Sequence, residues 1–204
     1  MVPDGNRLVL ASRSPQRRAI LEALGVRFVV RPSAFAEADV GAHEQVAQAN
    51  ALGKALAVNR SAGEVVLGVD TVVSLGGQIH GKQRDAAAAR ETLQALSGAT
   101  HAVVSGLALV GLDDSPRVAS CVTEVTFRSL EEPTIDWYLA SGEWRERAGG
   151  YAIQGAGCAL VESIAGDWTN VVGLPVGTLL GLHPELLAAR NNRFTAPDSG
   201  ELQH

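Results

Sequence analysis

The stretch Arg7-Leu8-Val9-Leu10-Ala11-Ser12-Arg13-Ser14-Pro15-Gln16-Arg17-Arg18 passes from a short apolar run into polar residues and then into an amphipathic segment ending at Gly25. An apolar strand followed at once by a helix is typical of α/β proteins. Ser14 is a good N-cap and Pro15 suits the first helical position, so we expect the helix to begin there. Its unpaired backbone N–H groups would then lie beside the end of the strand.

Two arginines, Arg17 and Arg18, fall in the first turn of this predicted helix. Cations there oppose the helix macrodipole, at a cost of about 0.3–1 kcal/mol each when exposed. An anion held between them would reverse that sign, which favours a phosphate-binding corner. The alternative is a pair of solvated arginines on a surface helix.

Apolar strands and amphipathic helices alternate through the first half of the chain, and β-branched segments dominate the second. We expect strands near 7–11, 28–31, 65–75, 100–110, 117–127 and 159–164, and helices near 15–24, 43–58, 86–96, 131–140 and, in two pieces, 175–191. Asp85 is the expected N-cap of the third helix. The pattern predicts one α/β domain over residues 1–190, with a mixed, twisted central sheet flanked by helices, followed by a polar tail over 191–204.

The composition limits the classes of partner. The chain has 204 residues, of which 46% are hydrophobic, and a formal net charge of -5, so attraction to a nucleic-acid polymer is not expected. Cys121 and Cys158 lie far apart with no metal-binding spacing, and we expect both to be buried thiols. No segment resembles a signal peptide or reaches the ~18 apolar residues that span a bilayer, so the expected location is the cytoplasm.

Asp70 is the most informative carboxylate. The apolar run Val65–Val69 predicts a buried strand with Asp70 at its end, and Thr71-Val72-Val73 follows at once. An ionised carboxylate near the core must be paired, hydrogen-bonded or metal-bound, and ligands collect at strand ends in open α/β sheets. The alternative is an aspartate that caps a turn.

Other polar residues are weaker candidates when each is taken alone. Glu37 lies near a strand end and reads as a loop residue, and Lys54 lies in a largely apolar helix, where lysine usually snorkels to solvent. Gly76–Lys82 matches half of a P-loop, but Gln83 stands where the magnesium-binding Ser or Thr would be. Gly76-Gly77 instead predicts a hairpin turn.

The segment Glu146–Gly157 is too rich in glycine for a regular element, and it retains the amide Gln154, which could contact a base edge. The alternative is a tight connection without a ligand. Further along, Asn170 is the polar residue that we expect to face a site, and Pro175 is expected at the first position of a helix.

Six separated blocks now share one order: LASRSPQRR (10–18), LGVDTVV (67–73), GK (81–82) before RDAAAARETLQALSG (84–98), THAVVSG (100–106), ERAGGYAIQG (146–155) and NVVGLP (170–175). Together they make the chain resemble the Maf family of nucleoside triphosphate pyrophosphatases over residues 7–185. That resemblance implies a fold related to the inosine triphosphate pyrophosphatases.

The resemblance implies hydrolysis of a nucleoside triphosphate, the substrate, between its α- and β-phosphates with a divalent metal, Mg²⁺ or Mn²⁺. Asp70 matches the family's proton acceptor, and Glu37 matches an acidic position that would bind the metal together with Asp70. Four residues match phosphate ligands: Ser12, Arg17, Lys54 and Lys82. The family also suggests a homodimer.

Base specificity in the family is associated with the positions that match Gln16, Thr71 and Gln154. Thr71 and Gln154 resemble the subgroup that prefers dTTP and UTP, whereas Gln16 stands where that subgroup has arginine. Arg13 and Arg18 could restore the missing charge. Two alternatives stay open: a P-loop NTPase that releases orthophosphate, and a regulatory module that binds nucleotide without hydrolysing it.

Overall fold

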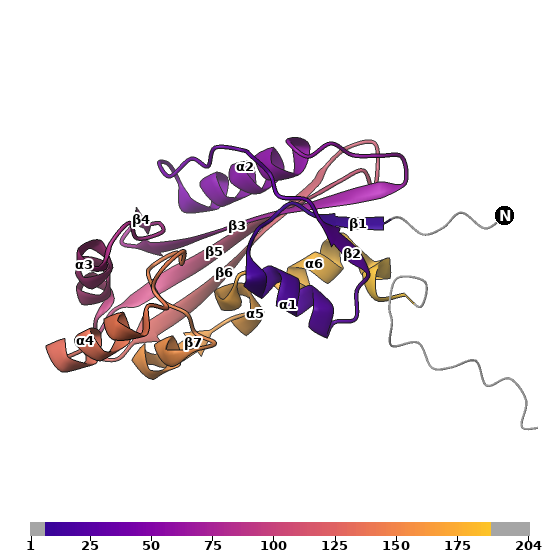
Figure 1. The fold of residues 1–204 in the computed structure, drawn as a ribbon. Helices are drawn as coiled ribbons and strands as arrows, with labels where there is room; N and C mark the ends of the chain where they lie inside the picture. The colour runs from indigo at the N-terminus through magenta and orange to yellow at the C-terminus, as the bar shows by residue number, and fades with distance from the viewer. Residues whose placement is uncertain (1–6, 189–204) are drawn as a thin grey trace, which may run out of the picture.

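The computed structural model describes residues 7–188, which form a mixed seven-stranded sheet with helices on both faces (Figure 1). The strands are β1 (Arg7–Leu10), β2 (Phe28–Val30), β3 (Glu64–Leu75), β4 (Gln78–His80), β5 (Thr100–Val110), β6 (Arg117–Phe127) and β7 (Val161–Ala165). The helices are α1 (Pro15–Ala23), α2 (His43–Leu56), α3 (Ala86–Leu96), α4 (Glu132–Ser141), α5 (Trp168–Val172) and α6 (Val176–Leu182), with two 3₁₀ turns, η1 (Ala156–Leu160) and η2 (Pro184–Leu187).

The sheet has the strand order β2-β1-β3-β5-β6-β7, and β4 pairs with β3 beside this path. β1 runs parallel to both β2 and β3, whereas the pairs β3–β5, β5–β6 and β6–β7 are antiparallel. The predicted mixed sheet and the predicted hairpins β3–β4 and β5–β6 are therefore confirmed. Gly76 and Gly77 form the tight turn between β3 and β4, both with positive φ.

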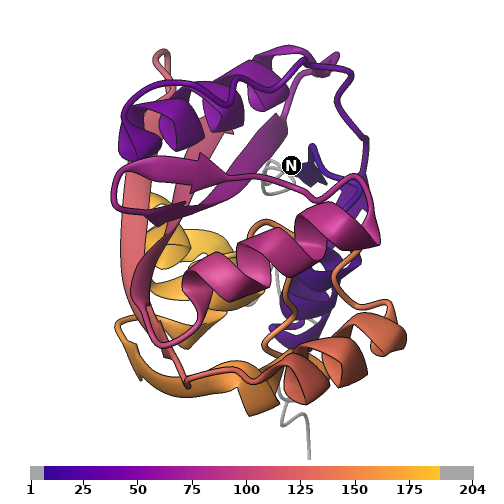
Figure 2. The ribbon, with the colours of Figure 1, turned by 90° about the vertical axis from the view of Figure 1, so that its left-hand side faces the viewer.

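The helices divide between the two faces and one end of the sheet. Figure 1 shows α2 on one face and α1, α5 and α6 on the other. In Figure 2, α3 and α4 lie toward the viewer at the end of the sheet. The Ser14 and Asp85 side chains accept hydrogen bonds from backbone N–H groups in the first turns of α1 and α3, so both predicted N-caps are confirmed.

Close packing of α2 on the sheet depends on two glycines, Gly68 in β3 and Gly106 in β5. A Cβ at Gly68 would lie 2.0 Å from the Ala51 carbonyl oxygen, and one at Gly106 would lie 2.2 Å from that of Ala47. The sequence thus lets the helix backbone approach the sheet with no side chain between them. This approach brings the polar face of α2 to the middle of β3.

The first prediction concerns that contact. Gly106→Ala should lower the free energy of unfolding by about 1–3 kcal/mol or more, because the added Cβ would meet the backbone of Ala47 and α2 would have to shift as a whole. Urea denaturation would measure the loss. Gly81→Ala is the matched control, since a Cβ there meets nothing within 4 Å. Equal stabilities for the two variants would contradict the packing described.

An ion pair ties the segment after β2 to the start of β3. Arg31 donates from both terminal nitrogens to Glu64, at 2.9 and 3.0 Å, and the Ser61 N–H donates to the same carboxylate at 2.9 Å. The Arg31 guanidinium, followed by the Ser61 N–H, lowers the pKa of the Glu64 carboxyl to about 2. The pair therefore contributes stability whenever Glu64 is ionised.

The second prediction follows from the sign of this shift. The pKa of Glu64 is lower in the folded chain than its ordinary value of 4.5. The contribution of Glu64 to the free energy of unfolding is therefore complete above pH 4.5 and is lost as the pH falls toward about 2. Glu64→Gln should lower the melting temperature at pH 7 and flatten its decline between pH 4.5 and 2. Parallel melting curves of variant and wild type across that range would refute the assignment.

Several expectations need correction. Cys158 is exposed, not buried, because it lies on η1 at the surface, and Cys121 is only partly buried. Pro175 precedes α6 as its N-cap and is not its first helical residue, and the short helix α5 was not predicted. The predicted tail over 191–204 lies outside the described residues. Within residues 7–188, no helix is both long and apolar enough to cross a membrane.

Candidate functional site

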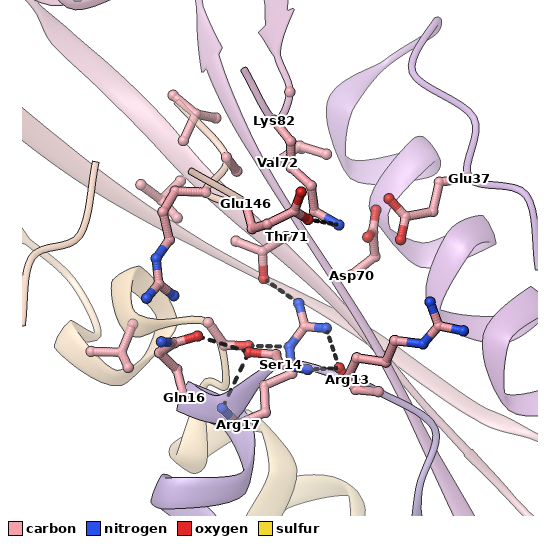
Figure 3. Close-up of a pocket in the computed structure, with 18 of the residues that line it drawn as sticks. Arg13, Ser14, Gln16, Arg17, Glu37, Asp70, Thr71, Val72, Lys82 and Glu146 are labelled. Carbon is pink, nitrogen blue, oxygen red and sulfur yellow. Dashed lines mark hydrogen bonds and ion pairs between the residues drawn. The ribbon is translucent and has the colours of Figure 1, made fainter. Parts of the chain in front are cut away.

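A cavity of about 950 Å³ opens where β1 ends beside β3 (Figure 3). Its size is in the range of small-molecule sites, about 300–1,000 Å³. The nine residues that the family resemblance assigns to the site all line it: Ser12, Gln16, Arg17, Glu37, Lys54, Asp70, Thr71, Lys82 and Gln154. These residues come from segments spread along most of the chain, so the fold brings together what the sequence separates.

Asp70 lies inside β3 and not at the end of a strand as expected, since β3 continues to Leu75. The opening arises because the neighbouring strand is short: β1 ends at Leu10, which pairs with Leu67. Beyond that point the edge of β3 faces the cavity, and Asp70 sits there with only 5% of its surface exposed. The alternative of a turn-capping aspartate is wrong.

Lys54 is buried, and its ammonium joins two carboxylates. Its Nζ lies 2.6 Å from Asp70 Oδ1 and 2.6 Å from Glu37 Oε1. Figure 3 shows the carboxylates of Glu37 and Asp70 close together. Lys54 does not snorkel to solvent as a lysine on an apolar helix usually does, because the close approach of α2 to β3 directs it inward.

Arg17 is held by acceptors of the protein itself. Its Nε donates to Gly173 O at 2.9 Å, Nη1 to Ser12 Oγ and Val69 O at 3.0 and 2.9 Å, and Nη2 to Thr71 Oγ1 at 3.1 Å. Four of the five N–H donors of a guanidinium are thus used. Among residues 7–188, no carboxylate lies within 4.0 Å of it.

The charge of Arg17 is accordingly fixed in place but not directly paired. Burial lowers the pKa of its guanidinium, and the charges of Asp70 and Glu37 offset part of that effect. Arginine remains protonated at any physiological pH. The cavity therefore contains an immobile positive charge that an anionic ligand would stabilise.

Ser12 has a hydroxyl hydrogen left to donate. Its Oγ accepts from Arg17 Nη1 at 3.0 Å and from the Ser14 N–H at 3.2 Å. A serine hydroxyl has two lone pairs and one hydrogen, so these bonds fill its acceptor capacity. The remaining hydrogen suits an acceptor such as a phosphate oxygen.

Lys82 reaches the same cavity from the connection between β4 and α3. The Gly149 N–H donates to His80 O at 3.0 Å, and Lys82 forms a β-bridge with Ala148, so the glycine-rich segment lies beside it. Lys82 Nζ is 3.9 Å from Glu146 Oε2, a long and solvent-exposed ion pair. Lys82 is not at a helix N-terminus, since α3 begins at Ala86, so the partial P-loop match has no P-loop geometry.

Two candidates do not reach the cavity. Arg18 pairs with Glu22 at 2.7 Å on the surface, so it cannot supply the positive charge that an arginine at position 16 would provide. Arg13, the other candidate for that charge, does line the cavity. Asn170 is fully buried and donates to Val103 O, Cys121 O and Thr123 Oγ1. It fixes α5 to the sheet and does not face the cavity.

Asn50 was missed by sequence reasoning. It is 1% exposed on α2, and its Nδ2 donates to Asp70 Oδ2 at 2.8 Å. The available signal was its spacing: Asn50 precedes Lys54 by four residues and so shares a helix face with it. Ser105 is a second buried residue that the sequence did not point to. Its Oγ lies 2.9 Å from Thr71 Oγ1, and no spacing in the sequence indicates this contact.

The donor set of the cavity includes two carboxylates suited to a hard cation. Mg²⁺ is commonly held by one or two carboxylates together with substrate phosphates, and Mn²⁺ accepts similar oxygen ligands. Glu37 and Asp70 both reach Lys54 Nζ and therefore lie close enough together to share such an ion. In the part of the chain that the structure describes, no group of three or more His, Cys, Asp or Glu residues is arranged to hold a metal.

The sequence of this chain is similar to those of several known proteins. A dTTP/UTP pyrophosphatase from Gloeobacter violaceus is 47% identical over 88% of this chain and 95% of its own. Those from Pyrococcus furiosus and Myxococcus xanthus are 40% and 42% identical, over 86% and 89% of this chain and 93% of theirs. A solved HAM1 protein from Coxiella burnetii covers 59% of this chain and 72% of its own at 19% identity with a TM-score of 0.41, a level that supports no inference.

The family assignment rests on the whole described domain. The model of the family described as Maf-like protein matches residues 7–185, which include every residue of the cavity named above. This chain belongs to the Maf family.

Proposed function

We propose that this chain hydrolyses dTTP and UTP to the nucleoside monophosphate and pyrophosphate, with Asp70 as the general base. One observation carries the proposal: a buried carboxylate lies in a cavity of nucleotide size that also contains the fixed charge of Arg17 and the ammonium of Lys82. The relatives named dTTP/UTP pyrophosphatase, at 40–47% identity over most of the chain, support the substrate and the reaction.

In this mechanism Asp70 orients the attacking water and accepts its proton. Each oxygen of the Asp70 carboxylate accepts one hydrogen bond from the protein, Oδ1 from Lys54 and Oδ2 from Asn50, and a carboxylate oxygen can accept a second. These two donors hold the base in place. Water can thus be held without breaking either bond.

The phosphates are bound by groups whose positions are already set. Arg17 is fixed by four hydrogen bonds, Ser12 presents its hydroxyl hydrogen, and Lys82 is exposed enough to adjust. Donors that are held in place stabilise developing negative charge without reorganising at the moment of reaction. Lys54 contributes its positive charge indirectly, through its ion pairs with Asp70 and Glu37.

A divalent cation, Mg²⁺ or Mn²⁺, completes the proposal, and Glu37 and Asp70 are the residues that would hold it. When bound, such an ion supplies Lewis-acid stabilisation of charge on the phosphate oxygens. Glu37, with 41% of its side chain exposed, is free to exchange its contact with Lys54 for the ion.

Base recognition is assigned to Thr71, Gln154 and Gln16. Gln154 is exposed in the glycine-rich segment and can both donate to and accept from a pyrimidine edge. Thr71 Oγ1 accepts from Arg17 Nη2, so its orientation is coupled to the phosphate end of the cavity. The homodimer suggested by the family stays a prediction.

A third prediction concerns Gln16, whose Oε1 currently accepts from Ser14 Oγ at 3.2 Å at the cavity wall. Gln16→Arg should lower the Kd for dTTP about 3- to 10-fold, because it adds a cation facing the triphosphate. Isothermal titration with a non-hydrolysable dTTP analogue would measure it. An unchanged or weaker affinity would mean that Gln16 lies outside the bound nucleotide's reach.

The product decides between the reaction classes. Incubating the protein with dTTP or UTP and Mg²⁺ or Mn²⁺ should release pyrophosphate and the monophosphate in equal amounts. Orthophosphate with a nucleoside diphosphate would overturn the proposal in favour of γ-phosphate hydrolysis. Tight binding of either nucleotide with no product would instead identify a regulatory module.

A further inference from the structure

We propose that Asn50 is a positioning residue that holds the Asp70 carboxylate and the segment carrying Glu37 in one arrangement. The inference rests on the proposed function, in which Asp70 acts as the base. It goes beyond that function because it assigns Asn50 a role that is exerted through Asp70. The side-chain amide of Asn50 links two parts of the cavity that the Lys54 ammonium also joins.

The contact with Asp70 fixes the plane of the carboxylate. Asn50 Nδ2 donates to Oδ2 at 2.8 Å, while Lys54 Nζ lies 2.6 Å from Oδ1. Two donors on different oxygens prevent the carboxylate from rotating about its Cβ–Cγ bond. With Lys54 and Asn50 as donors, the remaining lone pairs of the Asp70 carboxylate point in fixed directions.

The same amide binds the backbone of Ala38 at two points. Its Oδ1 accepts from the Ala38 N–H at 2.9 Å, and its Nδ2 donates to the Ala38 carbonyl at 2.8 Å. Both hydrogens of the amide are then used, one on Ala38 and one on Asp70. Because every bond fits only one orientation of the amide, the Ala38 backbone and the Asp70 carboxylate are positioned together.

The neighbours of Asn50 on α2 bind the same segment. A Cβ at Gly53 would lie 2.3 Å from the Phe35 ring, so that ring packs directly on the helix, and Lys54 pairs with Glu37. Positions 50, 53 and 54 have the i, i+3, i+4 spacing of one helix face. Each of these three positions contacts one residue of the 35–38 segment. Of the three, Asn50 is the one that also contacts Asp70 through an uncharged group.

A surface amide on the same helix provides the control. Gln48 Nε2 donates to Ser120 Oγ at 3.1 Å, away from the cavity. Gln48→Ala removes a side-chain amide and one hydrogen bond from α2 without altering the contacts of Asp70. Its effects should therefore be limited to a small change in stability.

The experiment compares Asn50→Leu, Asn50→Asp and Gln48→Ala in the full chain. Loss of a residue that orients a site group typically costs about 10- to 100-fold in activity, so kcat/KM for dTTP should fall by that factor in both Asn50 variants. The fall should lie in kcat, with KM for dTTP little changed, because Asn50 orients the base while the phosphate ligands Ser12, Arg17 and Lys82 keep their contacts.

A second readout does not depend on activity. Amide hydrogen exchange in residues 35–38 should quicken in Asn50→Leu, which loses both bonds to Ala38, and less in Asn50→Asp, which keeps an acceptor for the Ala38 N–H. If Asn50→Leu does not fold, Asn50→Asp provides the same comparison of kcat and exchange. Gln48→Ala should match the wild type in both.

Folded Asn50 variants with wild-type kcat, or with unchanged exchange in residues 35–38, would overturn the proposal. A fall in kcat/KM that lies in KM alone would also overturn it, since Asn50 would then support nucleotide binding and not the position of Asp70. If the wild type releases no pyrophosphate, the proposed function fails, and the exchange data still decide whether Asn50 fixes the segment.

Discussion

Asp70→Asn should lower kcat for dTTP hydrolysis by about 10²- to 10⁴-fold, the range expected for loss of a general base. Asparagine has the shape of aspartate and can still accept a hydrogen bond from Lys54, so the fold should remain intact. It cannot take up a proton from water at neutral pH, and it is a poorer ligand for a cation. Steady-state kinetics with a pyrophosphate assay would measure the change.

The matched control for this prediction is Asp85→Asn. Asp85 caps α3 outside the cavity, and asparagine is an equally good N-cap, so this variant loses a carboxylate with no effect on turnover. Wild-type turnover in folded Asp70→Asn would remove Asp70 from the chemistry. A variant that unfolds would show instead that its charge is needed for stability.

Lys54→Met should lower the free energy of unfolding by about 3–5 kcal/mol, the usual cost of leaving one partner of a buried ion pair unpaired. Methionine keeps the length of the side chain but not its charge. Asp70 and Glu37 would then face one another with no cation between them, and Asp70 is almost completely buried. Chemical denaturation at neutral pH without added metal would give the value.

The double variant Lys54→Met/Asp70→Asn separates this ion pair from packing. If the loss arises from the unpaired carboxylate, neutralising Asp70 should restore most of the stability, giving a coupling free energy of several kcal/mol. Additive losses would mean that the Lys54 stem matters for packing alone. A loss below about 1 kcal/mol in Lys54→Met would place the pair among weak surface interactions.

Local patterns predicted the framework well because they act over a few residues. Ser14 and Asp85 as N-caps, the turn at Gly76-Gly77 and the long hairpin β5–β6 depend on short-range chemistry, and each is confirmed. The lengths of neighbouring strands could not be predicted in this way. Asp70 is accessible only because β1 ends at Leu10, a fact of pairing between distant segments.

Local patterns also failed to predict which way polar side chains on helices point. Lys54 was placed in a largely apolar helix and Asn170 was expected to face a site, yet tertiary packing turns Lys54 into the cavity and buries Asn170 in hydrogen bonds to β5 and β6. Asn50 gave no signal apart from its spacing to Lys54. Nothing in the surrounding residues indicates whether a polar side chain on a helix faces a ligand or the sheet.

The central claim is that the Asp70 carboxylate and cations from distant segments surround one triphosphate. A crystal structure with an α,β-non-hydrolysable dUTP analogue and Mn²⁺ tests it most directly. The account predicts phosphate oxygens within hydrogen-bond distance of Ser12 Oγ, Arg17 and Lys82 Nζ, and the α-phosphorus one water molecule away from Asp70. A triphosphate bound elsewhere, or one whose α-phosphorus is shielded from Asp70 by protein atoms, would contradict it.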